Sequence, residues 1–97
     1  MRLRILSPAL DEIAEIATRY HAESPSAAVR FFEEYERLKA LIRSNPHIGR
    51  LDDLGSRWFT FRHFPYDLVY EVRSDEVVVM AVAHHRRRPG YWEDRLS

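Results

Sequence analysis

Residues 7–45, SPALDEIAEIATRYHAESPSAAVRFFEEYERLKALIRSN, decide the fold because they contain the same helix-start signal twice. Ser7-Pro8 and Ser24-Pro25 each place a serine, a good N-cap, before a proline, which is favoured at the first position of a helix. Apolar residues follow each pair at helical spacing. The pattern predicts one helix over about residues 8–22 and a second from about residue 25 to Asn45, where the following proline disfavours helical geometry.

The apolar positions and the short connection indicate how the two helices pack. Only one or two residues separate the helices, so we expect an antiparallel helical hairpin. The apolar stripe consists of Leu10, Ile13, Ala14, Ala17 and Tyr20 in the first helix and Ala28, Phe31, Phe32, Tyr35, Leu38, Leu41 and Ile42 in the second. A base-stacking role for Phe31, Phe32 and Tyr35 is the weaker alternative to core packing.

The charged residues of the second helix are expected to form its solvent-exposed face. They are Glu33, Glu34, Glu36, Arg37, Lys39 and Arg43. Pairs at helical spacing, Glu33–Arg37 and Glu36–Lys39, would support the helix.

Apolar residues alternate with polar ones on both sides of the hairpin, which is typical of strands. Leu3, Ile5 and Leu6 predict a short first strand, and residues 46–56 read as a loop. Strands are expected over 57–64, 66–73 and 77–83, joined by tight turns as an antiparallel meander. In the first of these, Phe59 and Phe61 would share one face, and Trp58 and Phe64 the other.

These elements predict an α+β fold in which an N-terminal strand and an antiparallel helical hairpin pack on a small antiparallel β-sheet. The chain of 97 residues is expected to form one domain, residues 1–97. The tail from His84 to Ser97 would add at most one helical turn. With no signal-peptide pattern and no membrane-length apolar run, we expect a cytoplasmic protein without a membrane partner.

The composition excludes several classes of function. Fifteen Lys and Arg balance fifteen Asp and Glu, so the formal net charge is zero, whereas proteins that bind nucleic acid nonspecifically usually carry excess base. The chain has no cysteine, which excludes disulfides, thiol nucleophiles and zinc ribbons. No histidine pair has the spacing of a metal motif, so no metal site is expected.

The sequence His84-His85-Arg86-Arg87-Arg88-Pro89-Gly90-Tyr91-Trp92, at the exit of the last predicted strand, is the main candidate for chemistry. Arginine binds anions and histidine transfers protons at neutral pH. In the alternative interpretation, the arginines pair with Glu71, Glu93 and Asp94 while Tyr91 and Trp92 pack the tail onto the sheet. Alternation would send successive side chains to opposite faces, so the whole run cannot act as one patch.

His63 lies on a neighbouring predicted strand and could form an acid–base pair with His84 or His85 for RNA cleavage. Such a reaction needs one group that activates the 2′-hydroxyl, one that protonates the leaving oxygen, and a cation at the phosphate. These residue types are common, so an ordinary surface or core histidine is the competing interpretation. Asp52-Asp53 is interpreted as a solvated loop.

The chain resembles the RelE/ParE superfamily of bacterial type II toxin–antitoxin toxins, often labelled plasmid stabilisation proteins. The resemblance is carried by five pieces in the family's order. They are Leu-Ser-Pro-Ala at 6–9, Ala-Ala-Val-Arg-Phe at 27–31, Asn-Pro-His-Ile-Gly-Arg at 45–50, Arg-His-Phe-Pro-Tyr-Asp-Leu-Val-Tyr at 62–70 and Val-Ala-His-His-Arg-Arg-Arg-Pro-Gly-Tyr-Trp at 82–92.

The resemblance implies a toxin held inactive in a hetero-oligomer by a cognate antitoxin, whose C-terminal segment folds along the hairpin and the sheet. It implies no cofactor. ParE-like members poison DNA gyrase without evident chemistry, whereas RelE-like members cut mRNA on the ribosome with sheet lysines and arginines and a late Tyr or His. A protein of this fold that has lost toxicity and only binds antitoxin is a third alternative.

The departures from the RelE-like pattern favour the ParE-like branch. The only lysine, Lys39, belongs to the second predicted helix, and the tail looks closer to ParE-like toxins. In the gyrase interpretation no catalytic residue is expected, and the target-binding residues are Arg86, Arg87, Tyr91 and Trp92. In the nuclease interpretation His63 or His85 transfers the proton, Arg62 and Arg86 bind phosphate, and Tyr91 gives support; Arg57 could add a further phosphate contact.

Overall fold

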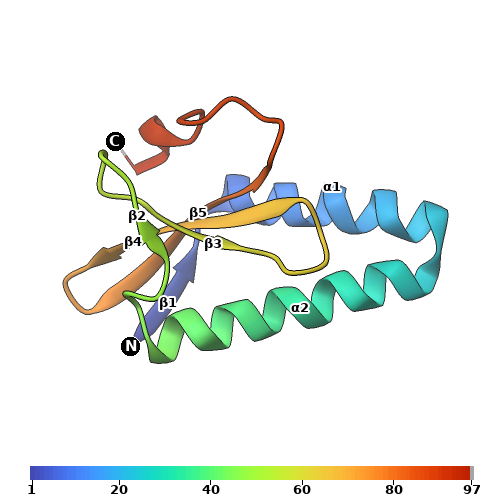
Figure 1. The fold of residues 1–97 in the computed structure, drawn as a ribbon, viewed down its shortest axis with the longest axis horizontal. Coiled ribbons are helices and arrows are strands. Elements are labelled where there is room, and N and C mark those ends of the chain that lie inside the picture. Colours follow the sequence, from blue (N-terminus) through green and yellow to red (C-terminus); the bar gives the residue numbers. More distant parts are fainter. Residues whose placement is uncertain (97) are drawn as a thin grey trace.

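The computed structural model describes residues 1–96, which form five strands, two long helices and a short 3-10 helix (Figure 1). In chain order these are β1 (Arg2–Ile5), α1 (Ser7–Glu23), α2 (Pro25–Ser44), β2 (Arg50–Leu51), β3 (Arg57–Thr60), β4 (Tyr66–Arg73), β5 (Glu76–His84) and η1 (Glu93–Leu96). The predicted α+β class is confirmed, and η1 is the single turn expected in the tail. Neither α1 nor α2 combines the length and the apolar character of a membrane-spanning helix.

The two helices form the predicted antiparallel hairpin, and Ser24 alone separates them. The Ser24 N–H donates to the Tyr20 carbonyl at 2.8 Å and ends α1, while the Ser24 carbonyl accepts from Ala27 at 3.0 Å in the first turn of α2. Ser24 is the N-cap of α2, as predicted, whereas the N-cap predicted at Ser7 is wrong because Leu6 is the N-cap of α1. Neither helix has a side-chain hydrogen bond at its N-cap.

The strand order across the sheet is β1-β5-β4-β3-β2. Consecutive strands from β2 to β5 pair antiparallel, which confirms the meander, but β1 pairs parallel with β5 and makes the sheet mixed. The α1–α2 hairpin supplies the long crossover that a parallel pair requires. Within the segment expected to be a loop, Arg50–Leu51 form β2, a strand too short to give an alternating signal.

The strand expected over 57–64 ends early, at Thr60. Residues 61–65 form a bend instead, in which the Phe61 N–H donates to the Tyr66 carbonyl at 2.9 Å. The facing predicted for Phe64 is therefore wrong, because its side chain packs in the same cluster as Phe59 and Phe61. Trp58 lies on the other face, as expected.

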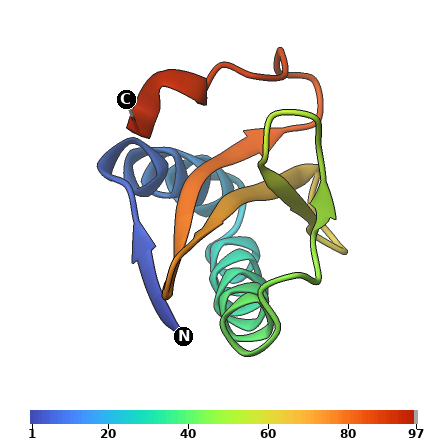
Figure 2. The same cartoon turned by 90° about the vertical axis from the view of Figure 1, so that its left-hand side faces the viewer.

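Each face of the sheet has its own apolar core. The hairpin-side core lies between the helices and the sheet and includes Phe31, Leu38, Ile42, Leu68, Tyr70, Val77 and Val79. The tail-side core consists of Val69, Val78, Met80, Ala81, Ala83 and Trp92. Figure 2 shows the C-terminal segment crossing the sheet on the side away from α2. Leu10, Ala14 and Phe32, expected in the core, are exposed.

A register shift between Val69 and Tyr70 changes the facing of the end of β5. Val69 pairs with Ala81 and Tyr70 with Val79, so Met80 is the extra residue of a β-bulge. As a result Met80 and its successor Ala81 both lie in the tail-side core, although neighbours in a regular strand face opposite ways.

Candidate functional site

Aromatic packing fixes the C-terminal tail on the sheet. The Trp92 ring lies 4.8 Å from that of Trp58 at 74° and 5.1 Å from that of Tyr91 at 79°, both favourable edge-to-face geometries. Trp92 is 2% exposed, so its side chain offers no surface to a partner. The predicted target contact through Trp92 is therefore wrong for this conformation, and Trp92 anchors the tail instead.

Glu12 of α1 joins the tail to the rest of the fold. Its Oε2 accepts a hydrogen bond from the Tyr91 hydroxyl at 2.8 Å, and the guanidinium of Arg95 donates to both carboxylate oxygens at 3.1 Å. Burial, together with the neighbouring Glu12 carboxylate, raises the pKa of the Tyr91 phenol well above its usual range. Tyr91 is therefore a neutral donor at physiological pH.

The same groups occupy the edge of β5 beyond the end of β1. Strand β1 pairs with β5 only as far as Val79, which leaves later backbone groups without a strand partner on that side. The Val82 N–H donates to Glu12 Oε1 at 3.0 Å, and the Met80 carbonyl accepts from Arg95 at 2.8 Å. The Glu12–Arg95 pair thus completes the hydrogen bonding of the sheet where β1 stops.

The turn after β5 places three consecutive arginines at the surface. Arg86, Arg87 and Arg88 are exposed. The Arg87 guanidinium lies 3.8 Å from the centroid of the Tyr91 ring and 3.9 Å from Glu12 Oε2. The expected pairing of a tail arginine with Glu71 is wrong, because that carboxylate binds Arg73 at 3.0 Å.

The two adjacent histidines face opposite sides, as alternation predicts. The His84 ring packs edge-on against Tyr66 at 5.1 Å, in contact with the hairpin-side core. His85 Nε2 lies 3.4 Å from Asp67 Oδ2, and the other oxygen of Asp67 accepts from the Thr60 hydroxyl at 2.6 Å. The half-exposed His85 ring is therefore oriented by a carboxylate.

His63 is not brought to His84 or His85. Its Nδ1 lies 3.3 Å from Oε1 of Glu34 on α2, the helix that covers one face of the sheet. His85 contacts Asp67, which alternates along β4 with core residues of the hairpin side and therefore faces away from α2. The His63 and His85 side chains thus bind carboxylates on opposite sides of the sheet, although the His85 backbone N–H donates to the Pro65 carbonyl in the bend at 2.9 Å.

Glu34, expected on the solvated face of α2, is 7% exposed, so that expectation is wrong. Its carboxylate accepts hydrogen bonds from the backbone N–H groups of Arg62 and His63 and so fixes the bend after β3. The expected Glu33–Arg37 pair does not form, because Arg37 lies 3.6 Å from Glu34 instead, whereas the Glu36–Lys39 pair forms at 2.9 Å.

Glu12, which was not singled out from the sequence, and Glu34, which was expected in solvent, both have a recognisable position in their helices. Glu12 lies three residues after Ala9 and four before Ile16, and Glu34 lies likewise between Phe31 and Leu38. All four flanking residues are buried. A carboxylate inside an apolar helical stripe is thus the signal that could have identified both groups.

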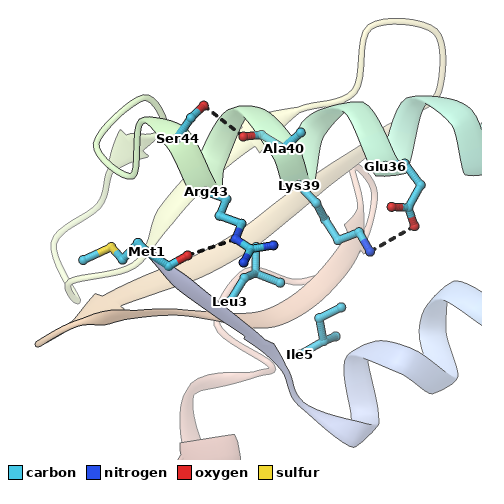
Figure 3. Close-up of a pocket in the computed structure, with 8 residues that line it drawn as sticks. All are labelled: Met1, Leu3, Ile5, Glu36, Lys39, Ala40, Arg43 and Ser44. Carbon is cyan, nitrogen blue, oxygen red and sulfur yellow. Dashed lines mark hydrogen bonds and ion pairs between the residues drawn. The ribbon is translucent and has the colours of Figure 1, made fainter.

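A groove of about 650 Å³ lies between β1 and α2 (Figure 3). Leu3 and Ile5 form its floor on β1, while Lys39, Ala40 and Arg43 line it on α2. Arg43 Nε donates to the Met1 carbonyl at 3.0 Å and closes one end. The groove adjoins β1, an edge strand of the sheet.

The described residues, 1–96, contain no group of three or more acidic or imidazole side chains that could hold a metal ion. The polar clusters around Glu12, Glu34 and Asp67 are each built from a carboxylate and its donors. Such clusters fix the positions of the groups that bind the carboxylate.

Comparison with known proteins relates the chain to toxins. Residues 3–89 match the family model described as ParE toxin of the type II toxin–antitoxin system parDE. A solved structure described as a chromosomal ParDE toxin–antitoxin system from P. aeruginosa superposes with a TM-score of 0.75 at 22% identity, covering 87% of this chain and 95% of that chain. No curated protein sequence matches the chain.

Proposed function

Because the chain belongs to the ParE toxin family of type II toxin–antitoxin systems, we propose that it inhibits DNA gyrase in the cytoplasm and blocks growth. A cognate antitoxin neutralises it by direct binding in a hetero-oligomer. The observation that carries the gyrase proposal is the exposed arginine turn at 86–88, which the buried Trp92 and the Glu12 cluster hold against the sheet.

The proposed target surface consists of Arg86, Arg87 and Tyr91, with Trp92 beneath it as the anchor. Interfaces are enriched in arginine and tyrosine, and a surface whose side chains are already ordered loses less entropy on binding. The zero net charge of the chain favours a protein target over a broad nucleic-acid contact.

The gyrase proposal is tested with purified enzyme. The chain should reduce DNA supercoiling and trap cleaved DNA, and the double variant Arg86→Ala/Arg87→Ala should be at least tenfold less potent. Arg73→Ala, a half-exposed arginine at the end of β4, is the matched control and should retain full potency. Unchanged supercoiling with no trapped breaks would exclude this target.

The groove between β1 and α2 is the surface we propose for the antitoxin. An extended segment can add to an edge strand through backbone hydrogen bonds and place alternate side chains in a neighbouring groove. Here β1 is at the sheet edge, and Leu3 and Ile5 supply the apolar floor.

A substitution that fills the groove tests the antitoxin surface. Ala40 is exposed and lines the groove, so Ala40→Arg should abolish co-purification with the product of a small adjacent reading frame while gyrase inhibition persists. Ala14→Arg, at an exposed position of α1, is the control. Undiminished co-purification of the Ala40→Arg variant would place the antitoxin elsewhere.

Ribosome-dependent mRNA cleavage is the second candidate, and the His85–Asp67 contact favours it. An imidazole oriented by a carboxylate can accept the proton of a 2′-hydroxyl, and Arg86 beside it could bind the phosphate. Primer extension after induction should then show new cuts within codons that disappear in His85→Ala. Normal growth after induction of soluble protein would instead support a fold that has lost toxicity.

A further inference from the structure

A row of alternating charge follows one flank of α2. Arg30, Glu33 and Arg37 are exposed and spaced at i, i+3 and i+7, so they lie above one another along the helix. This flank borders Phe64 and its neighbours in the bend after β3, whereas the opposite flank of α2 borders β1. The row is therefore separate from the groove assigned to the antitoxin.

The charged side chains of this row make only weak contacts with the rest of the described chain. Among residues 1–96, Glu33 has no hydrogen-bond or ion-pair partner. Arg30 reaches the Ser26 hydroxyl at 3.5 Å, and Arg37 lies 3.6 Å from Glu34, both at the long limit for such contacts.

A second wall faces the row across a hollow of about 510 Å³. Arg62, His63 and Phe64 form this wall. Within the described chain the Arg62 guanidinium has no partner, so it is available to a ligand. The buried Glu34 carboxylate holds the Arg62 and His63 backbone N–H groups, which fixes the distance between the wall and α2.

We propose that this hollow is a docking site for a helix of a partner protein. The partner helix runs parallel to α2 and carries an acid, a base and an acid at i, i+3 and i+7, so that each residue meets the opposite charge of Arg30, Glu33 and Arg37. A further acid on the adjacent face of the partner helix pairs with Arg62. The proposal does not depend on gyrase inhibition.

The spacing and the sign of the charges favour a protein helix over other anions. Arg30 and Arg37 are seven residues apart, which is about 10.5 Å along the helix, so a single phosphate group between them would lie beside the carboxylate of Glu33. Glu33 lies between them and repels a continuous polyanion such as RNA. A helix alongside α2 repeats the same side-chain spacing and can place a base opposite Glu33.

The test uses the purified full-length chain and two designed helical peptides on an alanine–glutamine background. The first presents Glu, Lys and Glu at i, i+3 and i+7, and the second has the same composition with the lysine moved to the first of these places. Backbone amide shifts at residues 30–37 and 62–64 should saturate with the first peptide. They should respond at least tenfold more weakly to the second, and raising the salt concentration should weaken both responses.

A charge exchange keeps the test independent of folding effects. The triple variant Arg30→Glu/Glu33→Arg/Arg37→Glu should lose binding of the first peptide and gain a peptide that presents Lys, Glu and Lys. Arg50→Glu, at an exposed position on β2, should leave binding unchanged. Equal binding of the two isomeric peptides, or no saturable shift at this hollow, would overturn the proposal. Tighter binding of oligouridine at these residues would assign the site to nucleic acid instead.

Discussion

The guanidinium of Arg95 donates to both carboxylate oxygens of Glu12 at 3.1 Å, a two-point ion pair that joins the end of the chain to its first helix. A bidentate pair of this kind fixes the relative orientation of the guanidinium and the carboxylate as well as the distance between them. Because the Glu12 carboxylate also accepts from Tyr91 and Val82, one side chain links α1, β5 and the tail.

Replacing Glu12 should weaken the attachment of the C-terminal tail to the sheet while the sheet itself stays folded. Glu12→Ala leaves the Val82 N–H and the Tyr91 hydroxyl without an acceptor, which should cost about 1–3 kcal/mol in the free energy of unfolding. Urea denaturation measures this loss, and hydrogen exchange should show faster exchange of the Arg95 amide, which bonds to the Trp92 carbonyl. The control Glu15→Gln, at an exposed position one residue before Ile16, should change neither quantity. Unaltered exchange in Glu12→Ala would show that aromatic packing alone holds the tail.

Glu34 should be required for the bend after β3. Glu34→Ala removes the acceptor of two backbone N–H groups and should lower the free energy of unfolding by about 1–3 kcal/mol. Glu34→Gln retains one acceptor oxygen and should cost less. The neighbouring Glu33→Gln, whose side chain is exposed, should stay within about 0.5 kcal/mol of the parent in the same urea titration. Equal losses in Glu34→Ala and Glu33→Gln would contradict this role.

Gly49 should not tolerate a side chain. A Cβ at this position would lie 2.7 Å from the Tyr70 hydroxyl oxygen and 3.1 Å from the Trp58 carbonyl oxygen. Gly49→Ala should therefore destabilise the fold by about 1–3 kcal/mol, measured by thermal or urea unfolding. Tyr70→Phe removes the acceptor of the Gly49 N–H and the donor to the Pro46 carbonyl, and serves to separate lost hydrogen bonding from steric conflict. A Gly49→Ala variant as stable as the parent would show that this loop can move away.

Asp52 should contribute stability that is lost in acid. Burial alone would raise the pKa of its carboxyl, but hydrogen bonds from Trp58, Ser56 and Leu54 and the charge of Arg50 lower that pKa below its usual value. Since the folded state holds the proton less tightly, this contribution is complete above the unfolded pKa of about 3.9 and is lost as the pH falls through the folded value. Asp52→Asn should therefore show a shallower loss of stability below about pH 4 in urea titrations. Parallel pH profiles for the two proteins would assign the acid sensitivity to other carboxylates.

Local periodicity predicted the parts of the fold that local interactions determine. Two Ser-Pro pairs and two apolar stripes located the hairpin, and the strands of the meander follow from alternation and turn residues. The parallel pairing of β1 with β5 could not be read in this way, because it joins Leu3 to Val77 across the whole hairpin.

The carboxylates of the site were missed for a different reason. The flanking apolar residues distinguish Glu12 and Glu34 from the exposed acids beside them, Asp11 and Glu33, but they do not show which groups the two carboxylates bind. Their burial depends on backbone N–H groups supplied by distant parts of the chain, Val82 for one and Arg62 for the other. In the tail, the residue types suggested a binding surface, but only the packing of Trp92 on Trp58 separates the anchor from the exposed arginines.

The bulge at Met80 decides which of the two adjacent histidines reaches which side of the molecule. Strict alternation from Val77 would bring His85 to the helices and leave His84 beside the tail, the reverse of what is found. A homologous chain of the same length in which β5 is regular would therefore exchange the environments of these two imidazoles without any change in its His-His dipeptide, whereas loss of the extra residue together with the bulge would preserve them. Aligning such sequences letter by letter would equate a histidine packed on Tyr66 with one held by Asp67. Structurally equivalent residues near the end of β5 therefore have to be assigned by their position relative to the bulge.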